Sequence, residues 1–144
     1  MNEAFHHIRK KYIDAISGNI TVSGSSVPIY NHVPTSVDTP FIKVYSYLQE
    51  EIDSNASSFT TECITRFEVV FGYFGDNGGE YELNQAVDGL LNIVRSRTNV
   101  DLSAEGFNVY TTTVDKMKYF PAEFENGKTY FRAIIDVSNR IEKT

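Results

Sequence analysis

The stretch FTTECITRFEVVFGYFGDNGGEYELNQAVDGLLNIV, residues 59–94, changes its hydrophobic period part-way along. Its first half alternates apolar and more polar residues. This period of two predicts a strand over residues 59–74, with one face formed by Cys63, Phe67, Val69, Phe71 and Tyr73. The glycine-rich segment 75–80 predicts a turn. The second half repeats apolar residues every three or four positions, which predicts a helix with a buried stripe of Leu83, Ala86, Val87, Leu90, Leu91 and Val94.

The segments on either side predict the rest of the fold. An apolar stripe predicts a helix over residues 3–17, which ends at Gly18 and Asn19. The segment PAEFENGK, residues 121–128, predicts a turn. Strand patterns cover residues 27–33, 39–49, 107–114 and 129–140. Long alternating strands between short polar turns favour antiparallel pairing. We therefore expect a single domain over residues 1–144 of the α+β class, in which a mainly antiparallel sheet carries two helices on one face.

The composition and the net charge of the chain exclude some classes of function. The net charge is −6 and the pI is about 5.0, so we expect no tight binding to the phosphate backbone of DNA. Cys63 is the only cysteine and lies in an apolar strand pattern, which favours a buried, inert thiol and a reducing compartment. The sequence has no long apolar run and no signal-peptide pattern at its start. We therefore expect no membrane span and a protein made in a cytoplasm.

The sequence offers few groups for catalysis. His32 is the one histidine in a plausible loop position, and no nucleophile-elbow pattern accompanies it. The segment GDNGGE, residues 75–80, carries oxygen ligands but lacks the spacing of a calcium loop. The many tyrosines could form a stacking platform for nucleic acid, but we expect no basic residues interleaved with them. We predict no catalytic, cofactor-binding or metal-binding residues and no enzyme activity. The aromatic strand surface instead indicates a protein partner or self-assembly.

A second stretch, VPIYNHVPTSVDTPFIKVY, residues 27–45, places two prolines between two strand patterns. Pro34 and Pro40 fix their own φ and bias the residues before them toward extended backbone. The crossing between the strands is therefore stiffened without hydrogen bonds, and such a loop, with Asp38 inside it, suits a surface presented to a partner. An ordinary strand connection with two prolines explains the same pattern.

With these features the chain resembles the tail-terminator, or tail-completion, proteins of long-tailed bacteriophages. The resemblance rests on an N-terminal amphipathic helix, the VP-containing stretch with its Pro40-Phe41 pair, and TRFEVVFGYFGDNGGEYELNQAVDGLLNIV, residues 65–94, as long strand, turn and second helix. It implies an α+β subunit that forms a hexameric ring, caps the head-proximal end of the tail tube and joins it to head-neck proteins. The family has no catalytic residues that could be assigned to positions of this chain. The segments EEIDSNASS, residues 50–58, and PAEFENGK have no clear counterpart in the family.

The net negative charge of the chain agrees with this resemblance, because a ring with a negatively charged lumen would let the genomic DNA slide through without specific binding. The segment EEIDSNASS predicts an exposed loop or hairpin tip. Within it Glu50, Glu51 and Asp53 are the candidates for reaching the ring axis or a neighbouring subunit. We expect the protein at the tail-neck junction of the virion, after synthesis in the host bacterial cytoplasm.

Three alternatives remain open on the sequence. One is another neck or head-closure component, which binds the portal rather than the tail tube. A second is a small regulatory α+β domain that binds a ligand in a pocket under the sheet. The last is an enzyme, which would need a titrating His32 close to an acid in a cleft.

Overall fold

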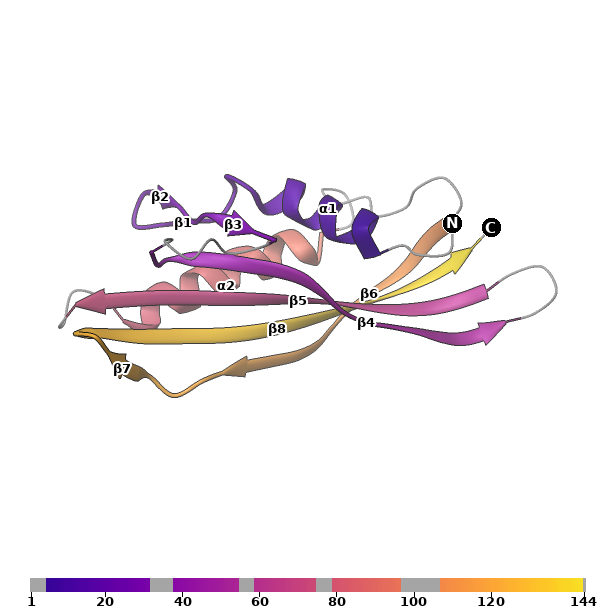
Figure 1. Ribbon diagram of the computed structural model, residues 1–144. Coiled ribbons are helices and arrows are strands. Elements are labelled where there is room, and N and C mark those ends of the chain that lie inside the picture. The colour runs from indigo at the N-terminus through magenta and orange to yellow at the C-terminus, as the bar shows by residue number, and fades with distance from the viewer. Residues whose placement is uncertain (1–4, 32–37, 55–58, 75–78, 97–106, 144) are drawn as a thin grey trace.

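The computed structural model describes residues 5–31, 38–54, 59–74, 79–96 and 107–143 (Figure 1). Along the chain these residues form the elements α1 (Phe5–Ile16), β1 (Thr21–Val22), β2 (Ser25–Ser26), β3 (Ile29–Tyr30), β4 (Phe41–Ser54), β5 (Phe59–Phe74), α2 (Glu80–Val94), β6 (Phe107–Tyr119), β7 (Glu123–Glu125) and β8 (Lys128–Lys143).

One sheet organises the molecule, in the strand order β3-β4-β5-β8-β6, with β7 paired to β8. Its long strands are antiparallel, and β5 lies at the centre. It pairs with β8 from Phe59 opposite Lys143 to Phe74 opposite Lys128 without a shift in register. Both helices lie on the same face of this sheet (Figure 1). The α+β class with two helices on one face, predicted from the sequence, is confirmed.

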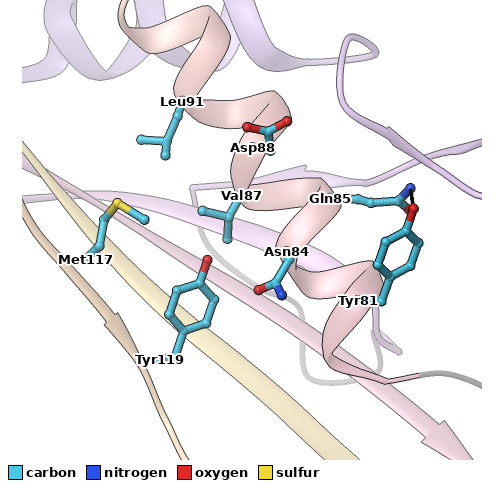
Figure 2. Close-up of a pocket in the computed structure, with 8 residues that line it drawn as sticks. All are labelled: Tyr81, Asn84, Gln85, Val87, Asp88, Leu91, Met117 and Tyr119. Atoms are coloured by element: carbon cyan, nitrogen blue, oxygen red, sulfur yellow. Dashed lines mark hydrogen bonds between the residues drawn. The ribbon is translucent and has the colours of Figure 1, made fainter.

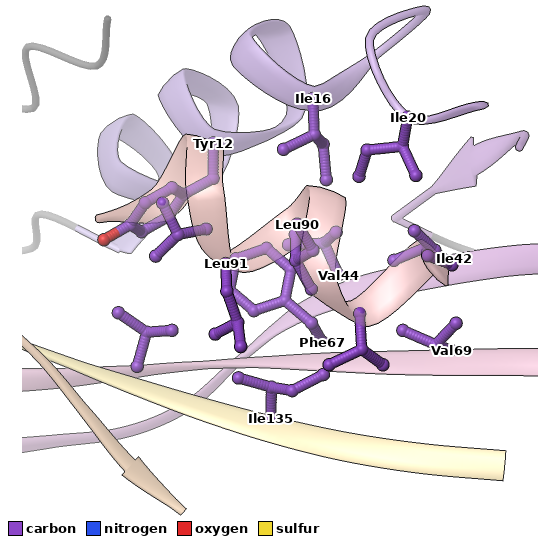
Figure 3. Close-up of a cluster of buried hydrophobic side chains, with 14 of the residues drawn as sticks. Tyr12, Ile16, Ile20, Ile42, Val44, Phe67, Val69, Leu90, Leu91 and Ile135 are labelled. Atoms are coloured by element: carbon purple, nitrogen blue, oxygen red, sulfur yellow. The ribbon is translucent and has the colours of Figure 1, made fainter. Parts of the chain in front are cut away.

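The core fills the space between the helices and the sheet, and it follows the predicted alternation. Phe67, Val69 and Phe71 of β5 are buried, and so are Ala133, Ile135 and Val137 of β8. The stripe of α2 covers them, as Leu90 and Leu91 show in Figure 3. α1 contributes Ile8, Tyr12 and Ile16, none of which is exposed. Two helical stripes and one strand face thus form a single apolar core.

A hydrogen bond inside this core joins α1 to the sheet. The hydroxyl of Tyr12 donates to Oδ1 of Asn139 on β8 at 3.0 Å, and the Asn139 amide donates to Oγ1 of Thr112 on β6 at 3.0 Å. The Tyr12 ring also meets the edge of Phe67, with 5.4 Å between ring centroids. Burial raises the pKa of Tyr12 to about 12, so the hydroxyl stays protonated and remains a donor. A buried polar pair therefore fixes where α1 sits on the sheet.

Three short strands lie outside the sequence-based prediction. β1 and β2 form a small hairpin across Ser23 and Gly24, whose φ angles of 54° and 83° are left-handed. β7 occupies part of the segment 121–128, which was predicted only as a turn. The turn itself is Asn126-Gly127, with φ of 51° and 82°, the geometry that Asn-Gly adopts between hairpin strands. Within the described part of the predicted strand 27–33, residues 27–31, only Ile29–Tyr30 form a strand, β3, which pairs with β4 in parallel.

Replacing Tyr12 by Phe tests the buried hydrogen bond. The variant leaves Oδ1 of Asn139 buried without this donor, so we expect the free energy of unfolding to fall by about 1–3 kcal/mol. Tyr81→Phe is the matched control, because Tyr81 is 69% exposed and its hydroxyl only accepts from Gln85. Its expected loss is under about 0.5 kcal/mol. Denaturant unfolding measures both, and equal losses would contradict the assignment.

Candidate interaction surfaces

The face of the sheet that the helices leave uncovered carries a regular array of side chains. Paired residues of neighbouring strands point to the same face, so the register defines three cross-strand rows. We name these twelve residues the basic-aromatic patch: Phe41, Val70, Arg132 and Phe120 in the first row, Lys43, Glu68, Ile134 and Lys118 in the second, and Tyr45, Arg66, Asp136 and Lys116 in the third.

The patch is positively charged within an acidic chain. It holds five basic side chains and two acidic ones, a formal charge of +3 in a protein of net charge −6. Two of its basic groups lie over aromatic rings. Lys43 Nζ is 5.1 Å from the centroid of Tyr45, and Lys118 Nζ is 4.9 Å from that of Phe120. The expectation that no basic residues interleave with the aromatic ones is therefore wrong, because strand pairing brings together residues that are distant in sequence.

Arg66 forms the structural centre of the patch. Its guanidinium donates two hydrogen bonds to Asp136, Nε to Oδ1 at 2.7 Å and Nη2 to Oδ2 at 3.0 Å. Its Cζ also lies 3.9 Å from the centroid of the Tyr47 ring, which is half exposed. These contacts leave Asp136 only 5% exposed although it lies on the face away from α1 and α2. The pairing with Asp136 raises the pKa of Arg66 above its usual value, so the side chain is a permanent cation.

Replacing Arg66 by Met would leave a buried carboxylate without its partner. We expect the free energy of unfolding to fall by about 3 kcal/mol. Lys10→Met is the matched control. Lys10 and Asp14 also form an ion pair at 2.7 Å, but their side chains are 74% and 59% exposed, so the expected loss is under about 0.5 kcal/mol. Thermal and denaturant unfolding measure both, and the interpretation fails if Arg66→Met is as stable as the control.

Acidic groups gather beside the patch, toward the end of the sheet where β4 and β5 are joined. Ser138 donates a hydrogen bond to Glu62 and is itself nearly buried. Asp115 lies nearby in a bulge of β6. Burial, followed by the charges of Glu62 and Asp136, raises the pKa of Asp115 above its ordinary value. The folded protein therefore disfavours the ionised form of Asp115.

This pKa direction predicts how stability depends on pH. Because the folded-state pKa of Asp115 is raised, Asp115→Asn should stabilise the protein at neutral pH. The gain should shrink as the pH falls through that raised pKa and vanish below the ordinary pKa of an aspartate, where the carboxyl is protonated in both the folded and the unfolded state. For Asp38 the expected change in stability has the opposite sign, because hydrogen bonds from Lys128 and the Thr39 N–H lower its pKa. Asp38→Asn should destabilise at neutral pH, and the loss should vanish in acid. Melting temperatures of both variants from pH 3 to 8 measure these effects. If the two variants shift the melting temperature in the same direction at neutral pH, the two opposite pKa shifts are contradicted.

A groove runs between α2 and the edge strand β6 on the helix-covered side (Figure 2). Its volume is about 530 Å³. Val87 and Leu91 of α2 and Met117 of β6 form its apolar surface, and Tyr119 and Asp88 add a hydroxyl and a carboxylate. Burial, and then the charges of Glu80 and Asp88, raise the pKa of Tyr119. The groove is therefore apolar with an acidic margin, and it was not predicted from the sequence.

The structure changes the interpretation of the predicted loop residues 50–58. Glu50, Glu51 and Asp53 belong to β4 and stand opposite Glu62, Thr61 and Thr60 of β5. Of the two predicted alternatives, an exposed loop is wrong for these three residues, because antiparallel pairing with β5 extends β4 to Ser54. The other alternative, the end of a hairpin, agrees with the pairing of β4 and β5. Their side chains, and residues 55–58, lie outside the described part of the structure.

The predicted presented loop is only partly described. Pro34 and His32 lie outside the described residues, whereas Asp38 is exposed and Pro40 follows a cis peptide bond. Stiffening of this segment by its prolines stays a prediction, and at its described end the segment also makes hydrogen bonds. Asp38 accepts a hydrogen bond from Lys128 at 2.6 Å and another from the Thr39 N–H at 2.8 Å. The hydrogen bond between Asp38 and Lys128 therefore connects this end of the segment between the two strands to the start of β8.

Thr39 makes a further contact, with β5. A Cβ at Gly72 would lie 2.6 Å from Oγ1 of Thr39, so any larger residue there would force the Thr39 side chain to shift.

Other site predictions concern reactive groups. Cys63 is buried, as predicted. Among the described residues no group of three or more His, Cys, Asp or Glu side chains is arranged to hold a metal ion. Within the same residues neither helix has the length and apolar character needed to cross a membrane.

A scan against models of known protein families gives no match, and a search of curated protein sequences gives none either.

Proposed function

We propose that this protein is a structural subunit of a bacteriophage tail. It assembles into a hexameric ring on the head-proximal end of the tail tube and joins the tube to the head-neck proteins. The genomic DNA passes through the ring without specific binding. The proposal is supported by the resemblance carried by the N-terminal helix and residues 27–45 and 65–94, and under it the protein acts at the tail-neck junction of the virion.

The observation that best supports an assembly role is the basic-aromatic patch. In the described part of the structure α1 and α2 pack on one face of the sheet, and the other face carries aromatic rings next to cations rather than a uniformly polar surface. Tyrosine and arginine are the residues that most often dominate protein interfaces. The groove between α2 and β6 gives the same subunit a second, differently shaped surface. Two unlike surfaces on one subunit suit the head-to-tail contacts of a ring.

The groove also supports a second candidate, the small ligand-binding domain. Its apolar walls with a few polar groups are typical of small-molecule sites. It lies at the sheet edge rather than in a pocket under the sheet, where a ligand was expected. Met117, at 43% exposed, makes it equally suited to a side chain of a protein partner.

Native mass spectrometry over a range of concentrations, with electron microscopy of the same samples, tests the assembly function. We expect closed rings of six copies, either in free solution or on the ends of tail tubes from the same phage. Binding to tubes rather than to portals separates a tail terminator from another neck component. A protein that stays monomeric at every concentration and leaves tube ends bare would contradict the proposal. Stabilisation of such a monomer by a metabolite would favour the ligand-binding candidate.

A further inference from the structure

The sheet that carries the basic-aromatic patch is acidic at its opposite end. This acidic end consists of residues 49–54 of β4, 59–63 of β5, 107–112 of β6 and 139–143 of β8. By sequence it holds five acidic residues and two basic ones, Arg140 and Lys143, a formal charge of −3. The acidic residues are Glu50, Glu51, Asp53, Glu62 and Glu142. The end of the β4–β5 hairpin extends past both helices (Figure 1).

Most of the charge in the two regions is too far apart to be neutralised within one chain, although Glu62 is only four positions from Arg66 along β5. Thr60, which stands opposite Asp53, is six positions from Arg66 along β5. A strand rises about 3.3 Å per residue, so the separation is about 20 Å. This exceeds the Debye length of about 8 Å at physiological salt. Unbroken pairing of β5 with β8 holds the two regions apart.

We propose that the acidic end of one copy docks on the basic-aromatic patch of a second copy. The formal charges of the two surfaces, −3 and +3, are equal and opposite. Tyr45 and Phe120 supply apolar contact area, and the lysines above their rings are already held where an incoming carboxylate can meet them. Each copy offers one surface of each kind, so the contact is head-to-tail. The inference rests on the proposed function, because it names the contact between subunits of the ring.

One acidic group inside the patch favours a protein occupant over nucleic acid. Glu68 lies between Lys43 and Ile134 in the middle row, whereas Asp136 in the third row is buried and paired with Arg66. A phosphate backbone laid across the sheet would meet the Glu68 carboxylate, whereas a protein surface can place a hydrogen-bond donor beside it. Arg140 at the acidic end is exposed and is a donor of this kind.

Charge reversal of each surface provides the test. The first variant, K43E/K116E/K118E, reverses the patch but leaves the Arg66–Asp136 pair intact. The second, E50K/E51K/D53K, reverses the acidic end. Each variant alone presents surfaces of like charge, so we expect self-association to weaken by roughly a hundredfold. The control K10E/K11E/R95E changes the net charge as much as the first variant, at exposed positions on α1 and just after the end of α2, and should assemble like the wild type.

Mixing the two reversed variants gives the decisive result. In an equimolar mixture every contact pairs opposite charges again, so we expect rings of six in which the variants alternate. One chain carrying all six substitutions should also assemble. Native mass spectrometry resolves the compositions, and circular dichroism confirms that each variant is folded.

The possible failures are distinguishable. If the wild type forms rings but the patch reversal does so equally well, or if the mixture fails to assemble, the inference is wrong and the proposed function stands. If the patch reversal assembles normally and instead loses binding to duplex DNA, the patch is a nucleic-acid surface. If the wild type forms no rings in solution or on tail tubes, both the function and the inference fail.

Discussion

The hydrogen bonding of β5 to β4 on one side and β8 on the other is the constraint on which the rest of the structure depends. Because β5 pairs with β8 over its whole length, its alternating side chains define two faces that run the full width of the sheet. One face carries Phe67, Val69 and Phe71, and the helices bury it. The other then has no apolar core to join, so its composition is available for interactions with other molecules.

Much of this arrangement could be predicted from the sequence, because it depends on local periodicity. The alternation around Phe67 and the helical stripe around Leu90 each lie within a few residues of chain, and both predictions are confirmed. β1, β2 and β7 are two or three residues long, too short to show a period. The parallel pairing of β3 with β4 depends on the path of the chain between them, which no local pattern indicates.

The candidate surfaces were less predictable, for a related reason. The basic-aromatic patch exists only when four strands are placed in register. Arg66 meets Asp136 across a separation of 70 residues, and no single segment contains both. Two partial signals were present in the sequence, the spacings Lys43-x-Tyr45 and Lys118-x-Phe120, which put a cation and a ring on the same face of a strand. They become informative only once the face is known to lack a helix.

Sheet geometry also bears on whether a head-to-tail contact closes into a ring. Strands twist, so the acidic end is rotated relative to the patch, and each added copy turns by an angle that depends on this rotation. Register shifts interrupt β4 between Ser46 and Leu48, and β6 between Val114 and Lys116. These irregularities lie between the two charged surfaces, and bulges increase local twist. The same irregularities that bend the edge strands would therefore help to set the angle between successive copies, and with it the choice between a closed ring and an open filament.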